Sequence, residues 1–198
     1  IKNSPSSDNY LNIPYFLAIA ENKDATFYPR FYTEDKILLQ TEYRQINSKS
    51  NHITDFSLFA QKGKNSKSHF FYEYGKILDF TNFEDSQVDL IVQKTSNDTY
   101  LKTNKLTSEI ETDNNILENS IGLNLYSNDL SIDFDTTIYE DLNKNDSDRF
   151  EYILPKINLV KKINNNTPLN GNFSFKSQAL IRNYNTNIYE KTNINDLI

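Results

Sequence analysis

The sequence predicts an all-β protein with roughly ten antiparallel strands that follow one another along the chain. Apolar and polar residues alternate in most segments, polar gaps separate these segments, and Tyr and Phe each occur thirteen times. Successive side chains of a strand point to opposite faces, so a period of two predicts sheets with one apolar face. Such sheets are typical of a transmembrane β-barrel and equally of a soluble β-sandwich.

The first two predicted strands span residues 10–20 and 25–33, and the polar turn 21–24 joins them. Pro14 lies in the first strand and Pro29 in the second. Proline has no N–H to donate to a neighbouring strand, so each of these strands is expected to pair poorly on at least one side. A plainer interpretation makes Pro14 a strand entry or bulge and Pro29 a strand start.

Six further strands are predicted from this alternation, at about residues 37–46, 51–61, 68–78, 88–93, 130–138 and 173–182. The stretch 97–119 fits the pattern least well. It is polar, and Leu101, Leu106 and Ile110 are only loosely periodic, so it could hold a short helix.

Several short motifs lie close together between residues 14 and 44, and two weaker ones follow later in the chain. They are Pro14-Tyr15-Phe16, Ala18-Ile19-Ala20, Asp24-Ala25-Thr26, Pro29 and Tyr43-Arg44, with weaker matches at Ser96–Leu101 and Tyr152–Ile157. Together they resemble the start of the β-barrel of the LptD family, the lipopolysaccharide-assembly outer-membrane proteins, also called organic solvent tolerance proteins. The resemblance implies an incomplete, antiparallel transmembrane β-barrel segment in the cell outer membrane. It also implies two more strands, one at about residues 116–126 after a loop from residue 97, and one at about residues 152–157.

The domain organisation follows from this resemblance. Residues 1–9 are expected to be a lead-in from a missing N-terminal periplasmic domain, and residues 10–198 a partial barrel domain. No apolar run approaches the roughly 20 residues that a membrane helix needs, so only barrel strands could cross a membrane.

The resemblance also implies a function. The family inserts lipopolysaccharide into the outer leaflet through a lateral opening between the first and last barrel strands. Pro14 and Pro29 match its gate prolines, and Tyr15, Phe16 and Phe27 would line the substrate path nearby. The implied partners are lipopolysaccharide, an LptE-like lipoprotein that plugs the lumen, periplasmic lipopolysaccharide bridge proteins and outer-membrane lipids.

Other functions find little support in the residues. A net charge of −6 without a basic cluster argues against nucleic acid as a partner. There is no cysteine, and His52 and His69 lack metal-ligand spacing, so both are interpreted as ordinary strand residues. Asp133 and Asp135 fit a solvated face, and the stretch from Asp141 lacks the glycine of a calcium loop. No catalytic residue, metal or cofactor is expected, and the protein is not predicted to be an enzyme.

Two alternatives stay open. One is another outer-membrane β-barrel, either a channel or a receptor, with a permanently open lumen. The other is a soluble β-rich glycan-binding module, in which the apolar faces would form a core.

Overall fold

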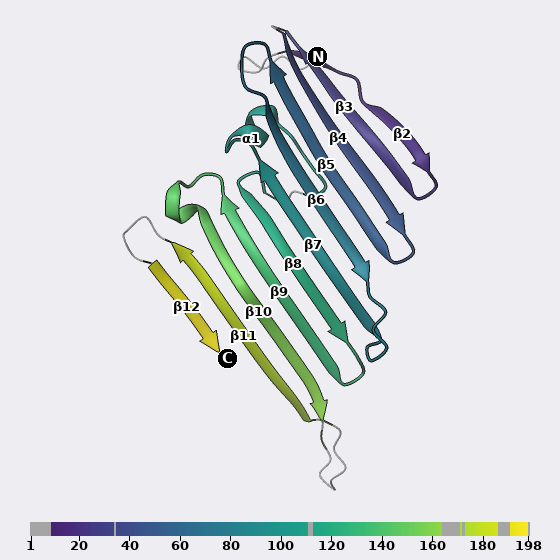
Figure 1. The fold of residues 1–198 in the computed structure, drawn as a ribbon, viewed down its shortest axis with the longest axis vertical. Helices are drawn as coiled ribbons and strands as arrows, with labels where there is room; N and C mark the ends of the chain where they lie inside the picture. Colours follow the sequence, from purple (N-terminus) through teal and green to yellow (C-terminus); the bar gives the residue numbers. More distant parts are fainter. Residues whose placement is uncertain are drawn as a thin grey trace. The chain divides into compact units, whose positions relative to one another are not determined.

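The structure is a computed structural model that describes residues 9–33, 35–110, 113–163, 171, 173–185 and 191–197. Nearly all regular structure in these ranges is β-strand (Figure 1). The strands are β1 (Tyr10–Asn12), β2 (Tyr15–Ala20), β3 (Lys23–Tyr32), β4 (Lys36–Asn47), β5 (Ser50–Gln61), β6 (Lys67–Ile77), β7 (Asp85–Thr95), β8 (Ile116–Tyr126), β9 (Leu130–Asp141), β10 (Phe150–Ile163), β11 (Phe173–Asn185) and β12 (Lys191–Leu197). A short helix, α1 (Tyr100–Asn104), follows β7, and a 3-10 turn, η1 (Asp146–Arg149), precedes β10.

The strands follow the chain order as a meander. The hydrogen-bonded order is β1-β3-β4-β5-β6-β7-β8-β9-β10-β11-β12, and β2 also pairs with β3. All the strand pairings with a described register are antiparallel. The predicted all-β antiparallel class is therefore confirmed.

The predicted strand positions agree with the structure, with three differences. The predicted first strand is divided into β1 and β2, four strands (β7, β9, β10 and β11) extend beyond their predicted ends, and β12 was not predicted. The strand predicted at 116–126 coincides with β8. The stretch before it holds α1, so a short helix does form there. Of the predicted lead-in, residues 1–8 lie outside the described ranges.

The chain divides into two compact units. Unit 1 comprises Ile1–Tyr74 and Val92–Asn114, and unit 2 comprises Gly75–Ile91 and Asn115–Ile198. Strands β6 and β7 each contribute to both units.

In unit 1 many large apolar strand residues lie on an exposed face, whereas Leu38 and Phe71, each 0% exposed, lie on the covered face. Strand register places Leu39 opposite Leu58, and Gln40 opposite Ser57, so the two pairs lie on opposite faces of the sheet. Leu39 and Leu58 are 39% and 43% exposed, whereas Gln40 and Ser57 are 5% and 0% exposed. A water-soluble sheet normally has the reverse arrangement, with its apolar face covered.

Unit 2 shows the same separation of apolar and polar faces. Phe134 of β9 lies between Leu123 of β8 and Ile157 of β10, on one face of the sheet. Its neighbour Asp135 is paired with Lys156 on the other face. Apolar and polar residues thus alternate in register across adjacent strands, as the sequence predicts.

No helix in the described part of the chain is long and apolar enough to cross a membrane.

Candidate functional site

Pro14 interrupts the first strand without changing its register. Strand β1 ends with Asn12 paired to Arg30, and β2 begins with Tyr15 paired to Phe27. Two residues on each strand separate these pairs, so β1 and β2 lie along β3 as one strand with a local break. The sequence-based expectation of poor pairing at this proline agrees with the break.

Pro29 lies inside β3, opposite Leu39 of β4, and is not a strand start. Its carbonyl oxygen accepts a hydrogen bond from the Ile13 N–H at 3.4 Å. The N–H and C=O of one strand residue point to the same side, so the missing donor of Pro29 faces β1 and β2 rather than β4. Pro29 therefore removes no donor from the hydrogen bonds between β3 and β4.

The missing donor of Pro14 faces the other way. Because the Ile13 N–H points toward β3 and backbone directions alternate along a strand, the Pro14 nitrogen faces the outer edge of the first strand. At this edge, β1 and β2 pair with no other strand among the described residues. The two prolines thus remove donors from both sides of the first strand.

The predicted substrate-path residues surround this break but lie on two faces. Tyr15 and Phe27 are paired on one face, with ring centroids 6.4 Å apart. Phe16 is paired with Thr26 and therefore points to the opposite face. Tyr15 and Phe16 are 60% and 57% exposed. The first strand therefore presents exposed aromatic side chains on both faces, unlike the alternating strands that follow it.

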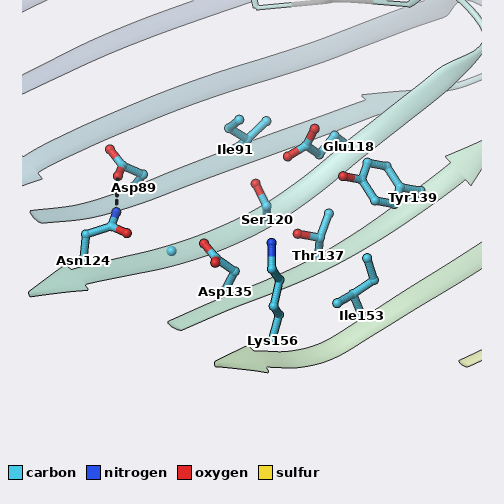
Figure 2. A pocket seen from close by; sticks show the side chains of 11 residues that line it. Asp89, Ile91, Glu118, Ser120, Asn124, Asp135, Thr137, Tyr139, Ile153 and Lys156 are labelled. Carbon is cyan, nitrogen blue, oxygen red and sulfur yellow. Dashed lines mark hydrogen bonds between the residues drawn. The ribbon is translucent and has the colours of Figure 1, made fainter. Parts of the chain in front are cut away.

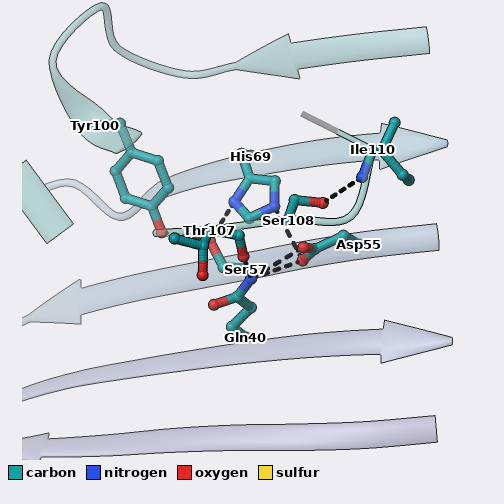
Figure 3. Close-up of polar contacts among 8 residues, drawn as sticks. All are labelled: Gln40, Asp55, Ser57, His69, Tyr100, Thr107, Ser108 and Ile110. Atoms are coloured by element: carbon teal, nitrogen blue, oxygen red, sulfur yellow. Dashed lines mark hydrogen bonds and ion pairs between the residues drawn. The ribbon is translucent and has the colours of Figure 1, made fainter. Parts of the chain in front are cut away.

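A buried polar cluster lies on the covered face of unit 1, and the sequence analysis missed it (Figure 3). His69 Nε2 lies 3.1 Å from Asp55 Oδ1, and His69 Nδ1 lies 2.7 Å from Ser57 Oγ. Gln40 donates to both Asp55 oxygens at 2.9 and 3.1 Å, and the Tyr100 hydroxyl lies 2.8 Å from Ser57 Oγ. The cluster joins β4, β5, β6 and α1.

The contacts from Asp55 to His69 and from His69 to Ser57 resemble those of a hydrolytic Ser-His-Asp triad, but the serine is inaccessible to a substrate. Ser57 is 0% exposed, and its oxygen contacts both His69 and Tyr100. Asp55 and His69 are each 1% exposed. A nucleophile must reach its substrate, so in this structure the cluster acts as a polar core.

His69 is therefore a member of a buried polar network and not only an ordinary strand residue. Part of this network could be recognised from the sequence. Gln40 and Ser57 occupy positions on strands where the alternation predicts one shared face. Three uncharged or weakly basic polar residues, Gln40, Ser57 and His69, with the Asp55 carboxylate on a shared face indicate a network. The partner from α1 could not be found this way, because the helix lies far along the chain.

A second polar feature lies on the polar face of unit 2, where most of its residues are half-buried. A cavity of about 270 Å³ is lined by polar residues of β7 to β10 (Figure 2). Lys156 extends between Asp135 and Thr137, and Asn124 donates to Asp89 at 3.4 Å. Carboxylates, hydroxyls and an ammonium group suit contact with water, ions or sugar hydroxyls.

The stretch from Asp141, which was compared with a calcium loop, forms a hydrogen-bonded turn. Asp141 accepts hydrogen bonds from the Asn143 N–H at 2.9 Å and lies 3.4 Å from the Lys144 ammonium, within the turn after β9. Within the described ranges, no group of three or more His, Cys, Asp or Glu side chains could hold a metal ion. No protein-family model matches the chain, and no curated protein matches it by sequence.

Proposed function

We propose that this chain is part of an outer-membrane β-barrel that inserts lipopolysaccharide into the outer leaflet through an opening beside its first strand. The observation that supports the barrel assignment is the exposure of an apolar face of the sheet together with the burial of polar residues on the opposite face. Leu39, Leu58 and Phe70 are exposed on one face, while Gln40 and Ser57 are buried on the other. Exposed apolar side chains are stable in hydrocarbon, and polar ones in a barrel lumen.

The lateral opening is supported by the first strand. A broken strand with donors missing on both sides separates from its neighbours at lower cost, since fewer hydrogen bonds must break. Pro14 and Pro29 are the residues responsible. The exposed aromatic residues on both faces suit a substrate with both acyl chains and sugars. The resemblance of this stretch to the LptD family supplies the identity of that substrate.

The same proposal includes the partners. Lipopolysaccharide and outer-membrane lipids would contact the first strand and the apolar face, respectively. An LptE-like lipoprotein would plug the lumen, and periplasmic bridge proteins would deliver the lipopolysaccharide.

Of the two alternatives, the soluble glycan-binding module fits the exposures least well. Phe56, Leu58 and Phe70 are each at least 40% exposed, and water would contact this apolar surface. A generic channel or receptor fits the exposed apolar face equally well but gives no role to the broken first strand.

A photo-crosslinking residue at Phe16 in the full-length protein tests the proposal in cells. We expect lipopolysaccharide to be captured at Phe16 only while transport is active. Leu58, on the exposed apolar face away from the first strand, is the matched position and should capture membrane lipid whether or not transport continues. Absence of transport-dependent capture at Phe16 in a correctly assembled barrel would leave the channel or receptor as the better account.

A further inference from the structure

The connection between β7 and β8 does not extend away from unit 1. Residues 100–110, named here the docked segment, begin with α1 and lie against the polar face of the sheet (Figure 3). The buried apolar side chains of the docked segment are Tyr100, Leu101, Leu106 and Ile110, none more than 5% exposed. The docked segment therefore covers this face as a packed layer.

Sheet side chains hold the docked segment through its backbone. Three residues from three strands each donate to a carbonyl oxygen, and the three carbonyls are spaced three residues apart. The bonds are Arg30 Nη1 to the Asn104 oxygen at 2.5 Å, Gln40 Nε2 to the Thr107 oxygen at 2.9 Å, and Gln93 Nε2 to the Ile110 oxygen at 3.1 Å. Buried carbonyls need such partners, so these side chains stabilise the docked position.

Two further contacts act at the ends of the docked segment. The Tyr100 hydroxyl joins the cluster at Ser57 Oγ, and the Glu109 carboxylate lies 3.7 Å from Arg44 Nη1. The docked segment is thus attached along its whole length, through side chains at both ends and through its backbone between them.

Docking removes this part of the polar face from water. Arg30 and Gln93 are 9% and 3% exposed, and Asp55 and His69 are each 1% exposed. Polar side chains that line an aqueous channel would stay hydrated, as those of an open barrel do. Here they bond to protein groups instead, so no water-filled path crosses the patch that the docked segment covers.

We propose that the docked segment is a built-in permeability seal, which blocks leakage of ions and small polar solutes along the inner face of strands β3 to β7. This rests on the proposed function only in assigning the polar face to the barrel lumen. The seal belongs to the chain itself and would act in addition to any separate plug protein.

Single-channel conductance of the full-length protein in planar lipid bilayers tests the seal. One variant combines R30A, Q40A and Q93A, which removes the three donors but leaves the docked segment unchanged. Another replaces residues 100–110 with a Gly-Ser linker, in case the triple variant fails to assemble. Thr103→Ala, at an exposed position of the docked segment, is the matched control.

We expect a several-fold rise in conductance for the triple variant and for the linker variant, and parental conductance for Thr103→Ala. Parental conductance in an assembled linker variant would overturn the seal. Capture of lipopolysaccharide at Phe16, measured on the same variants, separates the two proposals. Raised conductance without capture supports the seal and overturns export, whereas capture with unchanged conductance overturns the seal alone.

Discussion

The Pro29 carbonyl accepts the Ile13 N–H at 3.4 Å, and Pro29 has no N–H with which to return the bond. In an antiparallel sheet, residues that face each other in this way normally exchange two hydrogen bonds. The pair therefore holds the first strand to β3 with half of the usual bonding at this point.

Restoring the donors should tighten the first strand. In the full-length variant Pro14→Ala with Pro29→Ala, the N–H restored at position 29 faces the first strand, and the N–H restored at position 14 faces its outer edge, where the last strand would pair in the proposed closed barrel. Each such hydrogen bond is worth about 0.5–1.5 kcal/mol. We expect lipopolysaccharide to reach the cell surface more slowly, as followed by pulse labelling. Ile13→Ala changes a side chain here but no backbone donor, and it should export normally. Unchanged export in the double variant would remove the gating role of the prolines.

The two faces of β10 should differ in what surrounds them. Leu159 is paired with Ile132 on the apolar face, and the adjacent Asn158 with Asp133 on the polar face. These 198 residues contain no cysteine, so a cysteine introduced at either position is the only site for a nitroxide label within them. In the full-length protein in lipid, a label at 159 should be accessible to oxygen and one at 158 to a water-soluble nickel complex. Equal accessibility at both positions would contradict a lipid-facing sheet.

A charge on the apolar face should impair assembly. Leu159→Arg places a cation in hydrocarbon, which costs about 2–4 kcal/mol at the bilayer midplane. Asn158→Arg adds the same charge on the polar face and should be tolerated. The yield of folded barrel, read from its shifted gel mobility before boiling, measures the difference. Equal yields from the two variants would argue against the proposed membrane orientation.

Asp55 should be important for the stability of unit 1. Asp55→Ala removes the acceptor of His69 Nε2 and of one Gln40 N–H, while Gln40 keeps its bond to the Thr107 oxygen, and each unpaired buried group costs about 1–3 kcal/mol. We expect a lower urea midpoint for unfolding in detergent. Asp133→Ala, on the less buried polar face of unit 2, should change the midpoint little. Similar midpoints for the two variants would mean that the cluster contributes no net stability.

The docked segment should loosen at alkaline pH. Burial raises the pKa of Tyr100 above its usual value, although the hydrogen bond with Ser57 opposes this. The neutral form is thus favoured in the folded state, so its stabilising effect is complete below about pH 10 and is lost as the pH rises through the folded pKa. A spin label at Lys105 should become mobile in this range. With Tyr100→Phe the same label should show no such transition, and a persisting one would assign the effect to other groups.

Much of the strand order could be predicted because alternation is a local property. The range 130–138 was identified as a strand from its own alternation and lies within β9, whereas the strand at 116–126, which matches β8, was expected only from the family resemblance. Strand β12 (Lys191–Leu197) was missed, since Lys191-Thr192-Asn193-Ile194-Asn195-Asp196-Leu197 has few apolar residues and is a strand through its pairing with β11. The ends of β10 were underestimated for a related reason, because neighbouring strands extend the ladder on both sides.

The features of the candidate site likewise divide into those that the sequence could predict and those that it could not. The break at Pro14 follows from the chemistry of one residue, so the sequence was sufficient to predict it. The direction in which each proline lacks its donor was not predictable, because it depends on the bond between Ile13 and Pro29. The buried cluster needed still more distant information, since Ser57 and Tyr100 are 43 positions apart.

By itself, the sequence determined an antiparallel all-β chain with one apolar and one polar side to most strands, because side-chain direction in a strand depends only on position along it. Only the tertiary structure decided which side is covered. The docked segment buries Gln40, Asp55 and His69 through contacts between residues far apart in the chain, and local patterning carries no information about such contacts. That choice of face is what separates a lipid-facing sheet from a soluble one.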